Sequence, residues 1–280
     1  MNALERQLRD RVAAGEKLLA PFVTAGYPDL PTTAAILRAI DGLGLGCIEI
    51  GIPFSDPVAD GATIQASFTA ALDAGLTVGE VFEQMGTLAG ELVTPRIAMV
   101  SYSIGHAWGP KRFLSAAAEA GFAGVLFPDL PMGAEPRVAD LAGELGLANV
   151  MLVAPTTTPD RARRIAQASS GFIYYMSVAG ITGERRELPP ELSANVASLK
   201  AASDGKPVFV GFGIGRPEQV AQVTAVADGA IVGSALIRHI TGCIDAGKDA
   251  QATADTVLAY VEDLCTGLSG ARRDGSRDGR

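Results

Sequence analysis

The stretch Cys47-Ile48-Glu49-Ile50-Gly51 is a short apolar run, and a loop and two amphipathic windows, 62–74 and 78–88, separate it from the next such run at 97–101. A run that is almost continuously apolar is typical of a parallel strand covered on both faces. A strand, then helices, then another buried strand predicts a βαβ unit. The one interruption in the first run is the carboxylate of Glu49.

The same unit recurs along the whole chain. Further helical windows occupy 33–41, 111–120, 138–145, 161–168, 190–201 and 217–226, and the apolar runs lie at 18–24, 47–51, 97–101, 124–127, 150–153, 172–176, 208–210 and 230–232. Eight strands alternating with helices predict an α/β fold, a single-domain (β/α)8 TIM barrel with extra helices. We expect the barrel over 1–268 and a flexible tail over 269–280. A doubly wound open sheet has the same alternation, but its GxGxxG fingerprint is missing after the first run, at 22–26.

Composition limits the partners of this chain. The 280 residues are 48% hydrophobic and 19% charged, and the formal net charge at pH 7 is −8. Nucleic acid and anionic membranes both need a basic footprint, so neither is expected as the main partner. No apolar run reaches the ~18–20 residues of a spanning helix. Residues 1–17 lack a signal-peptide core, so we expect a cytoplasmic protein.

The cysteines and histidines indicate neither a metal site nor a catalytic triad. Cys47, Cys243 and Cys265 are an odd number and lie far apart, which favours reduced thiols over a disulfide framework. His106, in an expected loop, and His239, on an expected helix, have no Cys or His at metal-ligand spacing. We expect both histidines to be structural or exposed, and we expect no metal.

Glu49 is the first residue that suggests chemistry. Strand periodicity puts Ile48 and Ile50 on one face and Glu49 on the other. If the isoleucines pack under helices, Glu49 points into the barrel, where burial raises the pKa of a carboxyl group toward the range useful for proton transfer. A structural ion pair with an interior Arg or Lys is the alternative, but the neighbouring predicted strands contain neither.

Asp56 and Asp60 lie in the loop that follows this strand. Each has an ordinary interpretation as a turn residue, and Asp60 could cap the helix that begins near Ala62. A second carboxylate beside Glu49 at the barrel mouth would instead supply a pair for acid–base catalysis. Glu49 and Asp60 are therefore the catalytic candidates.

Glycines follow the last two predicted strands. Gly211, Gly213 and Gly215 come after the seventh, and Gly233-Ser234 comes after the eighth and opens a helix. They could simply make tight turns, but backbone N–H groups there can approach an anion, and phosphomonoesters commonly bind at this position in barrels. We expect a phosphorylated metabolite as the substrate.

The lysines exclude a Schiff-base aldolase, which needs a lysine at the C-terminal end of a strand. Two precede predicted strands, at the opposite end, and three lie on or near helices; in chain order they are Lys17, Lys111, Lys200, Lys206 and Lys248. The same positions exclude pyridoxal phosphate bound covalently to this chain.

Several motifs resemble the tryptophan synthase alpha chain family. The longest runs from Ile48 to Gly61, and the others, in the family's order, are 22–28, 177–183, 211–214 and 233–235. The resemblance extends from the first predicted strand to about Leu268. The long motif, Ile-Glu-Ile-Gly-Ile-Pro-Phe-Ser-Asp-Pro-Val-Ala-Asp-Gly, makes it specific.

The resemblance implies a lyase of tryptophan biosynthesis that cleaves indole-3-glycerol phosphate to indole and glyceraldehyde 3-phosphate by a retro-aldol reaction. It implies no cofactor on this chain and a beta subunit, carrying pyridoxal phosphate, in an α2β2 tetramer. Catalysis would fall to Glu49 and Asp60, and the phosphate would be held by main-chain groups of Gly183, Gly213, Gly233 and Ser234. The substrate-binding residues would be Phe22, Tyr102, Leu126, Tyr174, Thr182 and Phe212, although plain core packing also explains Phe22 and Leu126.

The segment 103–109 departs from the family pattern, because Ile104 stands where many members have asparagine. The family meets its beta subunit on this face, so the resemblance makes Asp56, Pro57 and Ile104 the expected interface residues. Two alternatives to an alpha subunit stay open. One is a stand-alone lyase that releases free indole, and the other is a barrel without turnover that activates a partner. The presence of both Glu49 and Asp60 argues against the latter.

Overall fold

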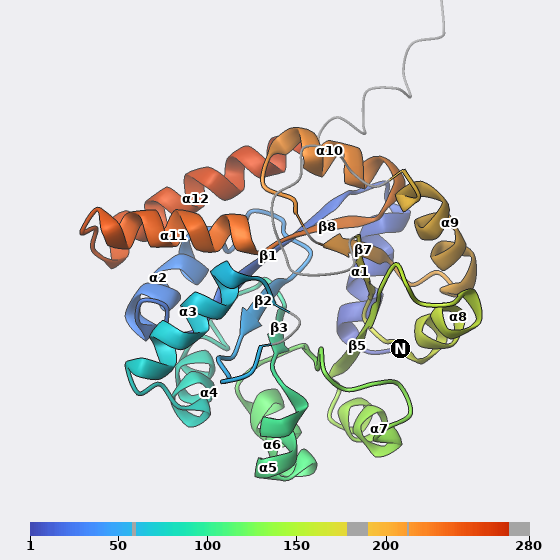
Figure 1. Cartoon of the computed structure of the whole chain (residues 1–280), viewed down its shortest axis with the longest axis horizontal. Coiled ribbons are helices and arrows are strands. Elements are labelled where there is room, and N and C mark those ends of the chain that lie inside the picture. The colour runs from blue at the N-terminus through green and yellow to red at the C-terminus, as the bar shows by residue number, and fades with distance from the viewer. Residues whose placement is uncertain (58–59, 178–189, 212, 269–280) are drawn as a thin grey trace, which may run out of the picture.

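A computed structural model of the chain describes residues 1–57, 60–177, 190–211 and 213–268. Eight parallel strands follow one another around a closed barrel, which confirms the predicted fold and excludes the open sheet (Figure 1). Closure is visible in β1, which pairs with β2 on one side and with β8 on the other. The strands are β1 Leu18–Thr24, β2 Ile48–Gly51, β3 Arg96–Met99, β4 Gly124–Leu126, β5 Ala148–Val153, β6 Ile173–Met176, β7 Val208–Gly211 and β8 Gly229–Val232.

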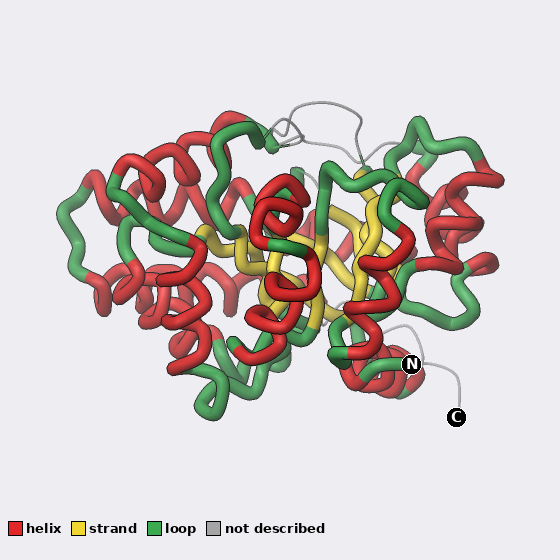
Figure 2. Tube along the Cα trace, turned by 90° about the horizontal axis from the view of Figure 1, so that it is seen from below, coloured by secondary structure: helices red, strands yellow, loops and turns green. Residues whose placement is uncertain are grey.

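Helices surround the strands, as the side view in Figure 2 shows. None of the helices within the described residues has the length and apolar character that crossing a bilayer requires. The helices are α1 Ala3–Ala13, α2 Leu30–Ile40, α3 Ala62–Asp73, α4 Val78–Thr87, α5 Tyr102–Trp108, α6 Pro110–Glu119, α7 Pro136–Glu144, α8 Pro159–Ala168, α9 Leu192–Ala202, α10 Pro217–Val226, α11 Ser234–Asp245 and α12 Ala250–Thr266. The expected tail at 269–280 lies outside the described residues.

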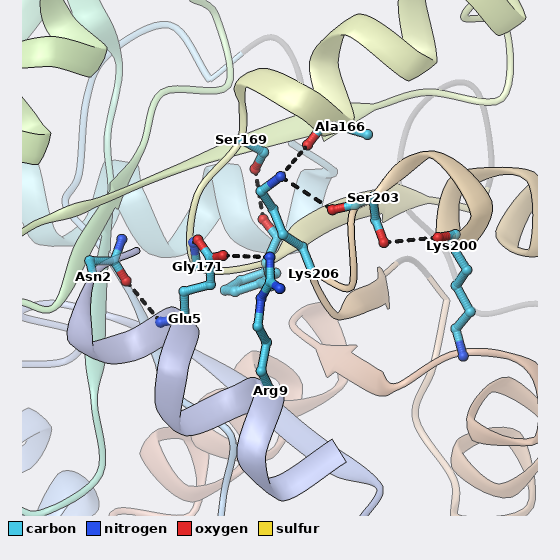
Figure 3. Close-up of polar contacts among 10 residues, drawn as sticks. Asn2, Glu5, Arg9, Ala166, Ser169, Gly171, Lys200, Ser203 and Lys206 are labelled. Atoms are coloured by element: carbon cyan, nitrogen blue, oxygen red, sulfur yellow. Dashed lines mark hydrogen bonds and ion pairs between the residues drawn. The ribbon is translucent and has the colours of Figure 1, made fainter. Parts of the chain in front are cut away.

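The N-terminal end of the barrel is closed by α1 and held by polar contacts (Figure 3). Glu5 is buried, pairs with Arg9 at 2.7 Å and accepts a hydrogen bond from the N–H of Gly171 just before β6. Lys206, before β7, donates to the carbonyl oxygens of Ala166 and Ser203. These groups stabilise the end of the barrel away from the strand C-termini.

The boundary of β3 differs from the prediction. The strand begins at Arg96, so a neighbouring strand of β2 does contain an arginine, contrary to expectation. Arg96 does not pair with Glu49, however, because its guanidinium donates to the carbonyl oxygens of Met85 and Gly121. The residue in register with Glu49 is Ile97.

The prediction that His106 lies in a loop is wrong, because residues 102–108 form the helix α5. Ser101 caps this helix by accepting from the N–H of Ser103, and the ring of Trp108 packs edge-on against Phe82 at 5.8 Å. The aromatic contact holds the short helix on the barrel, while His106 stays exposed. His239 lies on α11 as predicted.

The three cysteines are free thiols, as expected. Cys47 and Cys243 are buried and Cys265 is partly buried. The lysines also lie as predicted. Lys17 and Lys206 bind carbonyl oxygens at the N-terminal end of the barrel, far from the expected catalytic end.

Candidate active site

Glu49 is buried inside the barrel near the C-terminal end of β2. It lies in register with Phe22 of β1 and Ile97 of β3, and it is 2% exposed. Its Oε1 atom has no hydrogen-bond partner among the described residues. Burial, and then the nearby charge of Asp60, raise the pKa of Glu49 to about 8. The expected orientation and the raised pKa are both confirmed.

Asp60 lies two residues before the first residue of α3 and is 8% exposed. Its N–H donates to the carbonyl oxygen of Pro57 at 3.0 Å, while its Oδ2 has no partner among the described residues. The alternative that Asp60 caps α3 is wrong, because the N-cap is Gly61 and no side chain caps this helix. Burial raises the pKa of Asp60 to about 6.

The two carboxyl groups therefore differ in charge near neutral pH. With a pKa of about 8, Glu49 is mostly protonated at pH 7, whereas Asp60, with a pKa of about 6, is mostly ionised. Two neighbouring carboxyl groups with separated pKa values make a proton donor and a negative stabilising charge available in one site. This is what general acid catalysis beside a developing positive charge requires.

Tyr174 on β6 lies close to this pair. Burial, followed by the charges of Glu49 and Asp60, raises the pKa of its phenol well above the ordinary value. The ring needs the space beside Gly211 of β7, because a Cβ atom at Gly211 would lie 2.5 Å from the Tyr174 hydroxyl oxygen. The glycine that ends β7 is therefore explained by the tyrosine.

Phe22 of β1 forms an apolar wall beside Glu49. Its ring lies so close to Gly51 that a Cβ atom there would clash with it, and its centroid is 6.4 Å from that of Phe68. A Cβ atom at Gly233 would lie 3.7 Å from the Phe22 Cβ, so this wall reaches the start of α11. Leu126 of β4 is buried as well. Phe22 is thus placed between Glu49 and the glycine after β8.

Tyr102 comes from the helix after β3 and not from a strand. It is on α5, where its N–H donates to Asp129 and its ring packs against Phe127 at 5.4 Å. Burial and the charge of Glu135 raise the pKa of Tyr102. None of its described contacts involves Glu49 or Asp60, and its buried hydroxyl oxygen has no hydrogen-bond partner among the described residues.

The expected phosphate residues lie after β7 and β8. Gly213 has a φ of +79°, a conformation that favours glycine. Gly233 is the N-cap of α11, and no side chain caps that helix, so the N–H groups of its first turn are available to an anion. Gly183, a further expected phosphate ligand, and the expected substrate-binding residues Thr182 and Phe212 lie outside the described residues.

Two cavities lie outside the pair of carboxyl groups. One of about 510 Å³ lies between β5, the loop after β4 and the helices α7 and α8, and its mainly apolar lining includes Leu130, Met151 and Leu152 but neither Glu49 nor Asp60. The other, of about 310 Å³, joins the loop after β2 to α5 and includes Asp56 and Ile104. The expected interface residues Asp56 and Ile104 therefore line one cavity. Within the described part of the chain, no three His, Cys, Asp or Glu side chains form a possible metal site.

Sequence reasoning missed Gln65, which binds the backbone of the loop that carries Asp60. Its side-chain amide donates to the carbonyl oxygens of Asp60, at 2.8 Å, and Pro57, at 3.1 Å. The signal available in the sequence was a glutamine in the first turns of the helix that follows two candidate aspartates.

Comparison with known proteins identifies the family. A family profile described as "Tryptophan synthase alpha chain" matches residues 8–266. The chain belongs to the tryptophan synthase alpha chain family. The alpha chain of Rhodopirellula baltica is 39% identical over 272 residues, which cover 96% of this chain and 98% of the relative. That of Prochlorococcus marinus is 46% identical over 229 residues, covering 81% of this chain and 83% of the relative.

Solved structures agree with this assignment. Tryptophan synthase subunit alpha from Legionella pneumophila has a TM-score of 0.85 and 33% identity, covering 96% of this chain and 99% of that one. Tryptophan synthase from Mycobacterium tuberculosis has a TM-score of 0.84 and 31% identity, covering 95% and 98%. This alpha chain is thus a lyase of tryptophan biosynthesis. It cleaves indole-3-glycerol phosphate to indole and glyceraldehyde 3-phosphate and carries no cofactor, since pyridoxal phosphate belongs to the beta subunit.

Proposed function

We propose that Glu49 moves the protons of the retro-aldol cleavage. Cleaving the bond between indole C3 and the glycerol chain needs C3 protonated, so that the ring accepts the bonding electron pair. With its pKa of about 8, Glu49 carries that proton at neutral pH. The resulting carboxylate then accepts the proton of the hydroxyl group next to the breaking bond, which returns Glu49 to its starting state. The observation that carries this proposal is the buried carboxyl group of Glu49, which feels the charge of Asp60 and whose Oε1 has no partner among the described residues.

Asp60 is proposed to stabilise the positive charge that develops at the indole N–H when C3 is protonated. It is mostly ionised at pH 7, because its pKa is about 6, and its buried Oδ2 has no partner among the described residues. A preorganised negative charge in a water-poor site is effective for this purpose. We further propose Phe22, Leu126 and Tyr174 as walls of the indole pocket, with Thr182 and Phe212 as the family resemblance suggests. Tyr102 is proposed as a further member of this set on the family resemblance alone, since its described contacts are with Asp129 and Phe127 after β4.

The phosphate group is proposed to bind at main-chain N–H groups of Gly213, Gly233 and Ser234, with Gly183 as a further ligand. The uncapped start of α11 and the left-handed backbone of Gly213 support this assignment. Binding of glycerol phosphate to the whole chain, measured by calorimetry, tests it. Gly213→Val should abolish binding while circular dichroism shows a folded barrel, since a branched side chain is strained at this φ and crowds the anion. Unchanged binding by that variant would place the phosphate elsewhere.

We propose that the partner is a beta subunit in an α2β2 tetramer in the cytoplasm, docked over Asp56, Pro57 and Ile104. The exposed Asp56 and the cavity that it shares with Ile104 support this face as the interface. Indole is small and apolar, so a lyase that passes it directly to a second active site avoids losing it to solvent. The assay that separates this proposal from a stand-alone lyase is indole release by the isolated chain, with and without the beta subunit.

A further inference from the structure

The loop after β7 is held by side chains from two helices. Gln219, on α10, accepts a hydrogen bond from the N–H of Gly215 through Oε1 at 2.9 Å and donates to the carbonyl oxygen of Gly213 through Nε2 at 3.3 Å. Tyr260, on α12, donates its hydroxyl to the carbonyl oxygen of Gly215 at 2.9 Å. The loop that carries a proposed phosphate ligand is thus bound at three backbone groups from the side of the helices.

Burial of Gln219 and ring stacking of Tyr260 stabilise these hydrogen bonds. Gln219 is 5% exposed, and a buried amide that loses its hydrogen bonds carries a large desolvation cost. The loop conformation that satisfies both ends of this amide is therefore strongly favoured. The ring of Tyr260 is stacked on His239 of α11, with centroids 3.7 Å apart and planes at 17°. Tyr260 therefore reaches the loop from a fixed position.

The loop needs such support because of its composition. Gly213 and Gly215 have no side chains that restrict the backbone, so the loop alone has many accessible conformations. An anion site built from backbone N–H groups is effective only if these groups are already oriented, since ordering them on binding costs free energy. It also requires carbonyl oxygens, which repel an anion, to be engaged elsewhere. The carbonyl oxygens of Gly213 and Gly215 are bound by Gln219 and Tyr260.

We infer that Gln219 and Tyr260 are positioning residues for the substrate phosphate, acting through the backbone of 213–215. They hold the loop in the conformation that binds the anion and take no part in proton transfer. The inference rests on the phosphate site proposed above. It makes substrate affinity, rather than the chemical step, the property that depends on these two side chains.

The test compares Tyr260→Phe and Gln219→Met with the unmodified chain. Each variant removes hydrogen bonds to the loop at nearly constant volume, so the Kd for glycerol phosphate and the KM for indole-3-glycerol phosphate should rise by about three- to tenfold. The kcat should change by less than about twofold, because the transition state and the ground state share the phosphate contact. Tyr175→Phe is the matched control. The hydroxyl of Tyr175, on β6, accepts a hydrogen bond from Asn195 on α9, and none of its described hydrogen bonds is with residues 213–215. It should leave Kd and KM unchanged.

The possible outcomes separate this inference from the phosphate site itself. If the unmodified chain binds glycerol phosphate, Gly213→Val does not, and Tyr260→Phe binds as tightly as the unmodified chain, the positioning role is overturned while the site stands. A fall in kcat at constant KM would overturn it as well. If the unmodified chain and Gly213→Val bind equally, the phosphate site is wrong and the inference falls with it. Tyr260→Phe alone tests the positioning role even if Gln219→Met does not fold.

Discussion

Burial and the negative charge of Asp60 together raise the pKa of Glu49 to about 8. The pKa of Asp60 is raised by burial to about 6. Because of this difference in pKa, Glu49 is mostly protonated and Asp60 mostly ionised at neutral pH. Catalysis through this pair should therefore have a defined pH dependence. The turnover of bound substrate should fall as the pH rises through about 8, because Glu49 then loses the proton that it donates. A kcat that keeps rising from pH 7 to pH 9.5 would contradict this.

Glu49 should also lower the stability of the fold at high pH. Its pKa in the folded chain, about 8, lies above the ordinary 4.5. Between these values the unfolded chain binds fewer protons than the folded one, so stability is fully present below about pH 4.5 and is lost as the pH rises through 8. We expect Glu49→Gln to be more stable than the unmodified chain at pH 8.5, by on the order of a few kcal/mol, and to lose this advantage near pH 4.5. Urea unfolding of both proteins at the two pH values measures this difference in the free energy of unfolding. A difference that is equal at both pH values would contradict the raised pKa of Glu49.

Gly211 should not tolerate alanine. The added methyl group would lie 2.5 Å from the hydroxyl oxygen of Tyr174 and would displace the ring. We expect Gly211→Ala to destabilise the chain by about 1–3 kcal/mol and to reduce indole production. Gly242→Ala, on α11 with nothing within 4 Å of the new Cβ, should be neutral or slightly stabilising. Equal unfolding midpoints for the two variants would mean that Tyr174 is not packed as described.

Asp56 should contribute to binding of the beta subunit. Its side chain is exposed and accepts a hydrogen bond only from its neighbour Ser55 among the described contacts. We expect Asp56→Asn to weaken the complex by about two- to tenfold, measured by titrating the chain with the beta subunit and following indole production. Asp73→Asn, which changes an exposed charge at the end of α3, should leave affinity unchanged. Equal affinities for the two variants would remove Asp56 from the interface. A fully active isolated chain that forms no complex at micromolar concentration would favour a stand-alone lyase.

Much of this architecture was predictable from hydrophobic patterning. The alternation of Ile48, Glu49 and Ile50 was enough to orient the carboxylate, because neighbouring side chains in a strand must point to opposite faces. The helix α5 was not predictable in the same way. It has only seven residues, so its period is hard to detect, and it depends on the contact of Trp108 with Phe82 from α4.

The supporting residues of the site were also beyond sequence reasoning. Gln65 and Gln219 each bind a loop that precedes their own helix, and such contacts depend on the path of that loop. Tyr260 donates a hydrogen bond to the carbonyl oxygen of Gly215, which lies 45 residues earlier in the sequence. Arg96 was placed outside its strand because an arginine at a strand start interrupts an apolar run, although its charge is satisfied by two carbonyl oxygens. Family resemblance could supply the roles of Glu49 and Asp60 but not these supporting contacts.

The most direct test of the catalytic account is the turnover of Glu49→Gln. The amide keeps the size of the side chain but can neither donate the carboxyl proton nor accept the hydroxyl proton. With the beta subunit present, we expect kcat for indole-3-glycerol phosphate cleavage to fall by about 10²–10⁴-fold. The Kd for glycerol phosphate should be unchanged, which verifies that the substrate site is intact. A variant that binds normally and retains more than about a tenth of the original rate would remove Glu49 from the role of proton donor.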